Sequence, residues 1–274
     1  MSSAKLLPWI DLNNLDFDWL SGNPNDGAIQ LLSEHPNKIN WKILCKNPSE
    51  AAMELLAKYP NKICWESLSR NKSEDAVKIL AKHCDKIVWE YLAWNDSDAA
   101  LQLLERYPDR IDWVHLSGHS SDRALRLLDK NQDKIDWVML SANESPHAIW
   151  LLKTNPEKIN WENLCRNRCK DATAMQLLAA NPDKIHWVNL SCNTSEAAMQ
   201  LLAANPDKIW WAGLCENESE SEDVVKLLIT YPNKICWESL CRNRSAVAMR
   251  LLAENVDKMN VYCWAILANN TSEG

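Results

Sequence analysis

The stretch NKINWKILCKNPSEAAMELLAKYP, from Asn37 to Pro60, recurs along this chain with a period of 24 residues, lengthened to 26 in two places. Its tryptophan marks each copy. These tryptophans are Trp41, Trp65, Trp89, Trp113, Trp137, Trp161, Trp187, Trp211 and Trp237. A fixed period in this range is typical of a solenoid, in which each unit packs on its neighbours instead of around one central core.

The second half of the stretch predicts an amphipathic helix. Ala52, Leu55, Leu56 and Tyr59 follow the i, i+3, i+4, i+7 spacing of one helical face. Ser49 stands where an N-cap is expected, and serine recurs at this position in most copies. We therefore expect this helix to begin directly after the serine.

The first half predicts a shorter helix, partly of 3₁₀ type, that carries Trp41 and Leu44. We expect Asn37 or its equivalent to be the N-cap, since this position holds Asn, Asp or Glu in every copy. Asn47 recurs in all copies except one, where His119 replaces it. Asparagine tolerates the left-handed conformation, so we expect it to close the first helix.

These patterns predict an all-α fold, an α-solenoid of about nine full two-helix repeats, with the tryptophans and leucines buried between units. Residues 37–256 form the repeats, residues 1–36 a degenerate N-terminal cap, and residues 257–274 a degenerate C-terminal cap and tail. In this last segment either Val261 or Trp264 occupies the tryptophan position. The two-residue insertions, near residues 168–170 and 218–221, should bulge between the helices without breaking the stack.

The motif Asn-Pro-Asp-Lys-Ile-x-Trp-x-x-Leu-Ser-x-Asn, as at 181–193, resembles a short tandem repeat in proteins of large DNA viruses that infect algae and amoebae. The resemblance extends from about Asn23 to Asp257. It departs from the commonest form, which follows the asparagine with Pro-Asn-Ala. It implies a viral or protist origin and, as one option, a minor capsid or other virion protein. The architecture is also similar to leucine-rich variant repeats, although the iron–sulfur cysteine cluster of one member of that group has no counterpart here.

Composition narrows the function classes. The net charge of −7 argues against a general affinity for nucleic acid or anionic membranes. No run of 18 apolar residues occurs and the N-terminus lacks the apolar core of a signal peptide, so we expect neither a membrane span nor secretion. Cysteine alternates with Ser and Ala four residues after the tryptophan, which indicates packed thiols selected for small size. We expect a reducing intracellular compartment, the host cytoplasm for a viral protein, or the virion.

No motif for catalysis, a cofactor or a metal stands out. Cys165 and Cys169 have no second pair of ligands nearby in the sequence, and His115 and His119 span the expected end of a helix. No phosphate-binding loop or nucleophile elbow is present. We therefore predict a protein that is not an enzyme and that holds no cofactor.

Three tryptophans lie outside the repeat position, where the other copies carry mainly polar residues, and are candidate anchors of a protein interface: Trp94, Trp150 and Trp210. The alternative is that they pack on neighbouring units or on the insertions. A basic residue also recurs three positions before each repeat tryptophan, and this row could contact phosphates. Its members are Lys38, Lys62, Lys86, Arg110, Lys134, Lys158, Lys184, Lys208 and Lys234.

A purely structural interpretation of the basic row is that each side chain shields the acidic or amide residue before it and covers apolar surface with its stem. The leading prediction is thus a non-enzymatic scaffold that binds other proteins, capsid proteins among them, or forms part of a virus particle. A nucleic-acid-binding helical repeat that uses the basic row is the alternative.

Overall fold

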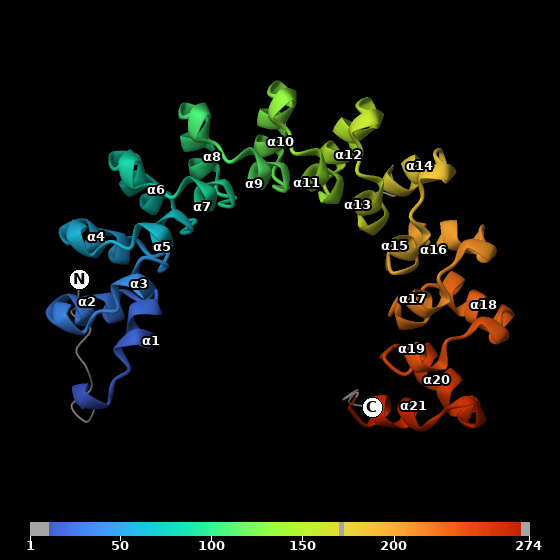
Figure 1. The fold of residues 1–274 in the computed structure, drawn as a ribbon. Helices are drawn as coiled ribbons and strands as arrows, with labels where there is room; N and C mark the ends of the chain where they lie inside the picture. Colours follow the sequence, from blue (N-terminus) through green and yellow to red (C-terminus); the bar gives the residue numbers. More distant parts are fainter. Residues whose placement is uncertain (1–10, 170–172, 270–274) are drawn as a thin grey trace. The chain divides into compact units, whose positions relative to one another are not determined.

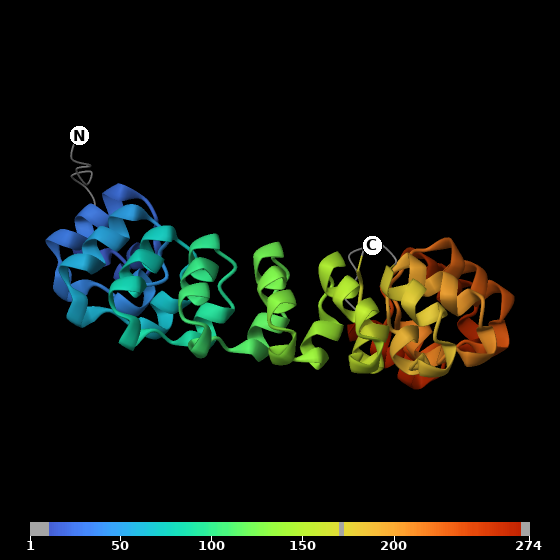
Figure 2. The ribbon, with the colours of Figure 1, turned by 90° about the horizontal axis from the view of Figure 1, so that it is seen from above.

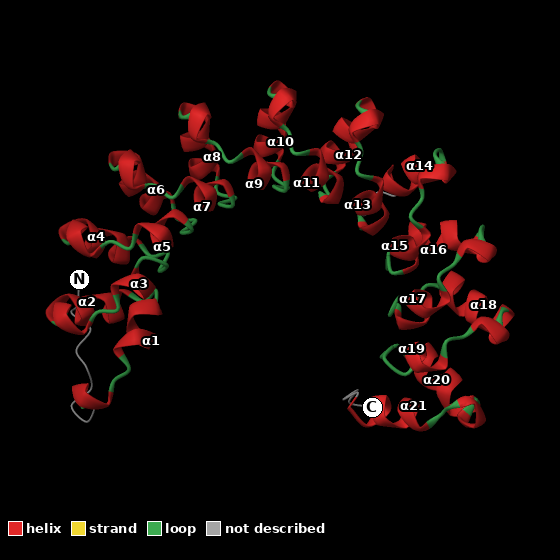
Figure 3. Cartoon of the chain, viewed as in Figure 1, coloured by secondary structure: helices red, strands yellow, loops and turns green. Residues whose placement is uncertain are grey.

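The computed structural model describes residues 11–169 and 173–269, and all its regular structure in these ranges is helical (Figure 3). The chain divides into two compact units, unit 1 (Met1–Ile135) and unit 2 (Asp136–Gly274), which are considered separately. Within each unit, short first helices form one row and longer second helices form another (Figure 1). The all-α repeat architecture predicted from the sequence is confirmed.

Each repeat contains a 3₁₀ helix, a first α-helix and a second α-helix. In unit 1 the first helices are α1 (Phe17–Gly22), α3 (Trp41–Leu44), α5 (Trp65–Ser69), α7 (Trp89–Ala93) and α9 (Trp113–Ser117). The second helices are α2 (Asp26–Glu34), α4 (Glu50–Lys58), α6 (Glu74–Lys82), α8 (Asp98–Arg106) and α10 (Asp122–Lys130). Successive helices of a row pack side by side, as the view from above shows (Figure 2).

Unit 2 repeats this pattern. Its first helices are α11 (Trp137–Ala142), α13 (Trp161–Arg166), α15 (Trp187–Ser191), α17 (Trp211–Glu216), α19 (Trp237–Leu240) and α21 (Val261–Asn269). Its second helices are α12 (Pro146–Thr154), α14 (Thr173–Ala179), α16 (Glu196–Ala203), α18 (Glu222–Thr230) and α20 (Ala246–Glu254). The 3₁₀ helices have three residues each, as in Pro36–Lys38 and Pro60–Lys62. No helix in the described ranges is both long and apolar enough to span a lipid bilayer.

The expected cap of the first helix is wrong, whereas that of the second helix is confirmed. Asn37 lies inside the 3₁₀ helix, and the first α-helix begins at Trp41 with Asn40 as its N-cap. The Oδ1 atom of Asn40 accepts a hydrogen bond from the backbone N–H of Ile43 at 3.1 Å. The prolines that precede Asn37 and its equivalents start this extra 3₁₀ turn, because a proline needs no hydrogen-bonded N–H there. The Oγ atom of Ser49 caps α4 as predicted.

The leucines form the core, and the repeat tryptophans lie at its rim. Counting the tryptophan as position 1, the position 4 leucines such as Leu44 and Leu68 are fully buried. The nine repeat tryptophans are only half-buried, so their expected burial between units is partial. Several of them pack against the ring at position 19 of the same repeat, as Trp41 does on Tyr59 with 5.1 Å between ring centroids. In these repeats the indole connects the start of the first helix to the end of the second.

The asparagine at position 7 joins consecutive repeats. Nδ2 of Asn71 donates to the backbone oxygens of Cys45 and Asn47, both at 2.9 Å, while its Oδ1 accepts from the N–H of Ser73 at 2.9 Å. The equivalent bonds recur within each unit, and we call this series the asparagine ladder. Its members with described bonds to the preceding repeat are Asn47, Asn71 and Asn95 in unit 1, and Asn167, Asn193, Asn217 and Asn243 in unit 2.

The expected left-handed conformation of these asparagines is wrong. Asn143 and Asn167 have φ values of −75° and −66° with extended ψ values, so the backbone leaves the first helix as an extended segment. Asparagine suits this position because its amide supplies both donors and an acceptor. The insertions do not break the ladder, since Asn193 still bonds to Asn167 at 2.8 Å across one of them.

His119 takes the asparagine's place in the last full repeat of unit 1. Its Nδ1 accepts from the backbone N–H of Ser121 at 3.2 Å, as the asparagine Oδ1 does elsewhere. Burial lowers the pKa of this imidazole, and the carboxylate of Asp96 opposes that shift. The ring is therefore neutral at pH 7, and its unprotonated Nδ1 accepts this bond.

Position 5 is small, as predicted, and where it holds serine or cysteine its side chain also accepts a hydrogen bond from the next repeat. The Oγ of Ser69 donates to the carbonyl of Trp65 at 2.8 Å and accepts from the N–H of Val88, in the next repeat, at 3.1 Å. The Sγ of Cys45 accepts from the N–H of Cys64 at 3.3 Å in the same way. The choice between serine and cysteine thus preserves a bond between repeats.

The two ends of the described chain follow the repeat more closely than the sequence indicated. Phe17 occupies position 1 of α1 and packs edge-on against His35, so a complete two-helix unit lies within the segment predicted to be a degenerate cap. At the other end, α21 begins at Val261, with Asn260 accepting from the N–H of Cys263 at 3.0 Å. Val261 therefore holds the tryptophan position, and Trp264 the leucine position.

Candidate functional site

The first helices present a variable surface on a constant frame, and by frame we mean the residues that pack or bond between repeats. Positions 4, 5 and 7 are used for packing between repeats, whereas positions 2 and 6 lie four residues apart on one exposed helix face. Position 6 of one repeat meets position 3 of the next: the guanidinium carbon of Arg70 lies 3.6 Å from the ring centroid of Tyr91. We call positions 2, 3 and 6 of the first helices the first-helix edge.

Trp94 lies on this edge in unit 1, at position 6 directly after α7, and is 50% exposed. Its ring packs edge-on against His115, at position 3 of α9, with 5.2 Å between centroids. Val114, next to His115 in the chain, is 48% exposed. Trp94, Val114 and His115 form an apolar group that we call the Trp94 patch.

The frame fixes the geometry of this patch. Asp112 caps α9 by accepting from the N–H of His115 at 3.1 Å, and its other carboxylate oxygen lies 2.7 Å from Nδ1 of the same residue. The imidazole is thereby held against the indole of Trp94. The surface is accessible and pre-ordered, which lowers the entropic cost of binding.

Trp210 lies in unit 2, one residue before position 1 of its repeat, where it is the N-cap residue of α17, and it is 42% exposed. Its backbone N–H donates to the Oγ of Ser191 at 3.0 Å, which is the position 5 bond between repeats. The indole folds over Gly213, where any Cβ atom would collide with it. Glycine at this place in α17 is therefore a consequence of the tryptophan three residues earlier.

Trp150 belongs to a different surface. It lies on the second helix α12, is 49% exposed, and packs edge-on against His147 with 5.6 Å between ring centroids. All three predicted anchors are thus accessible, but they do not form one site. Val114 and its equivalents Val138 and Val188 are exposed but were not among the residues predicted from the sequence. The signal that could have identified them is that position 2 holds charged residues in several other repeats.

The basic row is exposed throughout, and much of its charge is compensated. Lys86 lies 3.4 Å from the carboxylate of Asp85, and Lys134 lies 3.3 Å from that of Asp133. Lys184 and Lys208 have the same pairing, and six of the nine basic residues directly follow an acidic one. This is the shielding expected from the structural interpretation of the basic row. It leaves only a weak positive electrostatic potential to attract phosphates.

The thiols and imidazoles do not converge on a metal. The ten cysteines all lie in described segments, and none forms a disulfide. Burial raises the pKa of Cys45 and of Cys215 to about 11, so these thiols are protonated at neutral pH. Cys169 uses its backbone N–H to bond to the ladder, at 2.9 Å from Oδ1 of Asn167. Within the part of the chain that the structure describes, no three His, Cys, Asp or Glu side chains form a metal-binding group.

No protein family, no curated protein and no solved structure matches this chain significantly. The resemblance to the tandem-repeat proteins of large DNA viruses therefore stays a prediction from the motif.

Proposed function

We propose that this chain is a non-catalytic scaffold that binds another protein along its first-helix edge, with the Trp94 patch as the anchor in unit 1. The observation that carries the proposal is the half-exposed indole of Trp94 beside an exposed valine. Lys46, Arg70 and Arg166 occupy the same position in other repeats, so packing between repeats does not require an aromatic ring there. Exposed, pre-ordered aromatic residues are frequent energetic anchors of protein interfaces.

The division of labour within the repeat supports a binding role. The ladder, the leucines and the position 5 acceptors hold the frame, while positions 2, 3 and 6 vary in charge, size and polarity. A frame of this kind allows the surface to change without loss of the fold, as in other solenoids that bind through extended surfaces. An enzymatic role has less support, because burial keeps the Cys45 and Cys215 thiols protonated at neutral pH.

The resemblance stated above motivates a narrower proposal, in which the partner is a capsid protein and the chain is part of a virus particle. The protonated, buried thiols suit a reducing compartment during assembly. Mass spectrometry of purified particles tests this narrower proposal separately. If the chain is absent from such particles, the proposed role that remains is an intracellular adaptor.

The proposal is tested by affinity purification from the source cells with the full chain and two matched variants. Trp94→Ala should release the partner, whereas Trp150→Ala, which removes an equally exposed indole from a second helix, should retain it. Binding should also survive about 0.5 M salt, at which phosphate contacts are strongly weakened. A partner that is retained by Trp94→Ala, or that is a nucleic acid released by salt, would contradict the proposal.

A further inference from the structure

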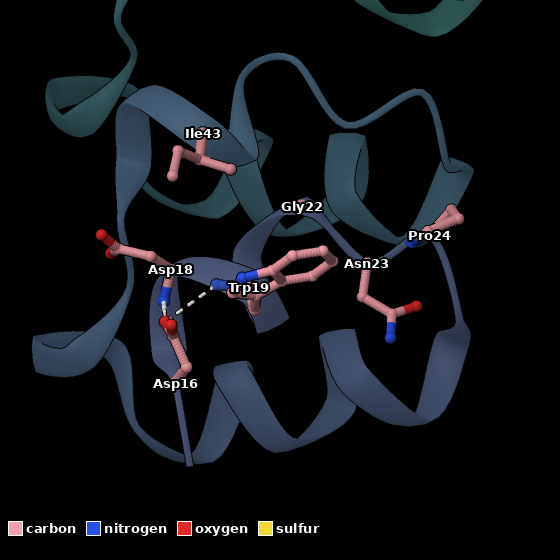
Figure 4. Close-up of a pocket in the computed structure, with 7 residues that line it drawn as sticks. All are labelled: Asp16, Asp18, Trp19, Gly22, Asn23, Pro24 and Ile43. Carbon is pink, nitrogen blue, oxygen red and sulfur yellow. Dashed lines mark hydrogen bonds between the residues drawn. The ribbon is translucent and has the colours of Figure 1, made fainter. Parts of the chain in front are cut away.

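A cavity of about 580 Å³ opens beside α1, at the N-terminal end of unit 1. Figure 4 shows the indole of Trp19 in the middle of the group that lines it, with Ile43 across from the ring and Asp18 to one side. Trp19 is 80% exposed, the highest value among the large apolar side chains of the described segments. The lining residues are Asp16, Asp18, Trp19, Gly22, Asn23, Pro24 and Ile43.

The cavity exists because one side chain of the repeat pattern is missing. At two other junctions of unit 1, the position 6 side chain covers position 3 of the next repeat: Arg70 covers Tyr91, and Trp94 packs on His115. In α1 the residue at position 6 is Gly22, which leaves Ile43 at position 3 of α3 uncovered. A Cβ atom on Gly22 would lie 3.4 Å from the Cγ2 of Ile43, which is ordinary van der Waals contact. The space is therefore large enough for a side chain in this position.

The Arg70 junction shows which side chain occupies position 6 when the space is filled. There the guanidinium lies over the ring of Tyr91 and within 3.8 Å of the Oε1 atom of Glu66, at position 2 of its own repeat. In α1 position 2 is also acidic, since it holds Asp18. The acidic group and the apolar surface are thus both present around the cavity, and the arginine is absent.

The carboxylates at the cavity are fixed by the frame. Asp16 caps α1, because its Oδ1 accepts from the N–H groups of Asp18 and Trp19 at 2.9 and 3.1 Å. The Oδ1 of Asp18 accepts from Nδ2 of Asn40 at 2.9 Å. Among the described residues none donates to the Oδ2 atom of either aspartate, so each retains an acceptor for an incoming cation.

We propose that this cavity binds an arginine side chain of a partner protein. Its aliphatic stem would fill the space between Trp19 and Ile43 that Gly22 leaves open, and its guanidinium would reach Asp18. The exposed indole adds a cation–π face, and arginine suits this arrangement better than lysine because its planar group both stacks and pairs with a carboxylate. The site is separate from the Trp94 patch and does not depend on the function proposed for that patch.

The test uses the full chain and three blocked tripeptides, Gly-Arg-Gly, Gly-Lys-Gly and Gly-citrulline-Gly. The indole Nε1–H resonance of Trp19, assigned with Trp19→Phe, is followed by NMR during titration. We expect saturable shifts for the arginine peptide with a Kd on the order of 1 mM, and weaker binding of the lysine peptide. The neutral citrulline peptide should bind at least about fivefold more weakly, and Asp18→Asn should reduce this difference.

Two glycine variants provide the control. Gly22→Arg fills the cavity from within the chain, as Arg70 does at its own junction, and should abolish the shifts. Gly27→Arg adds the same charge at the half-buried second residue of α2, outside the cavity lining, and should leave them intact. Equal shifts with the citrulline peptide, or full binding by Gly22→Arg, would overturn the proposal. So would movement of the Trp19 resonance by Lys5→Gln without peptide, because the cation would then come from the chain itself.

Discussion

Replacing Asn71 by alanine should weaken the stack more than any surface change. The substitution removes two hydrogen bonds to the preceding repeat and one to the N–H of Ser73, and it leaves two buried carbonyl groups and one half-buried N–H group without their partner. A net contribution of about 1 kcal/mol per bond, with a further cost for each buried group that water cannot reach, gives about 3–5 kcal/mol of lost stability.

Urea denaturation followed by far-UV circular dichroism measures this loss. Asn61→Ala, in the exposed 3₁₀ turn of the same repeat, is the matched control and should change stability by less than about 0.5 kcal/mol. Asn71→Asp keeps the acceptor and loses both donors, so it should be at least as damaging as alanine at pH 7. Equal effects of Asn71→Ala and Asn61→Ala would refute the claim that the ladder holds the repeats together.

Three further outcomes follow from the same contacts. Burial lowers the pKa of His119 in the folded chain, so its contribution to the free energy of unfolding should be fully present above about pH 6.5 and should fall as the pH drops below it. The difference between the urea midpoints at pH 7.5 and 5.0 should therefore be smaller for His119→Asn than for the unchanged chain. An equal difference in both would exclude His119 as the cause. Gly213→Ala should displace the indole of Trp210, visible as a shift of its Nε1–H resonance, whereas an unmoved resonance would contradict the packing described. Native alkylation at pH 8 should modify the exposed Cys192 and spare the buried Cys45, as peptide mass spectrometry would show, and equal labelling would contradict their difference in burial.

The parts of the fold that depend on local spacing could be predicted from the sequence. The period fixed the repeat, and Ser49 with the leucines of α4 gave the second helix and its cap. The first helix was harder, because Asn37 and Asn40 are both good capping residues and only the position of the 3₁₀ turn decides between them. Phe17 was not recognised as the position 1 residue of α1, because a tryptophan, Trp19, follows it only two residues later.

The parts that depend on contacts between repeats could not be predicted. The role of Asn71 rests on two carbonyl groups 24 and 26 residues earlier in the chain, and a single sequence contains no signal for such bonds. The pairing of Arg70 with Tyr91 has the same origin. Of the candidate anchors, Trp94, Trp150 and Trp210 were identified by their polar equivalents, but only the structure assigned Trp150 to a different row of helices.

The central claim is that each repeat is held only by its neighbours through equivalent contacts. Deleting one whole repeat, residues 65–88, joins Cys64 to Trp89 and lets Asn95 meet Asn47 in ladder register. Far-UV circular dichroism should show the same helicity per residue as the full chain and a cooperative urea transition. Deleting only residues 65–76 destroys the register and should abolish cooperative unfolding. Loss of folding on removal of the whole repeat, or equal tolerance of both deletions, would contradict the account.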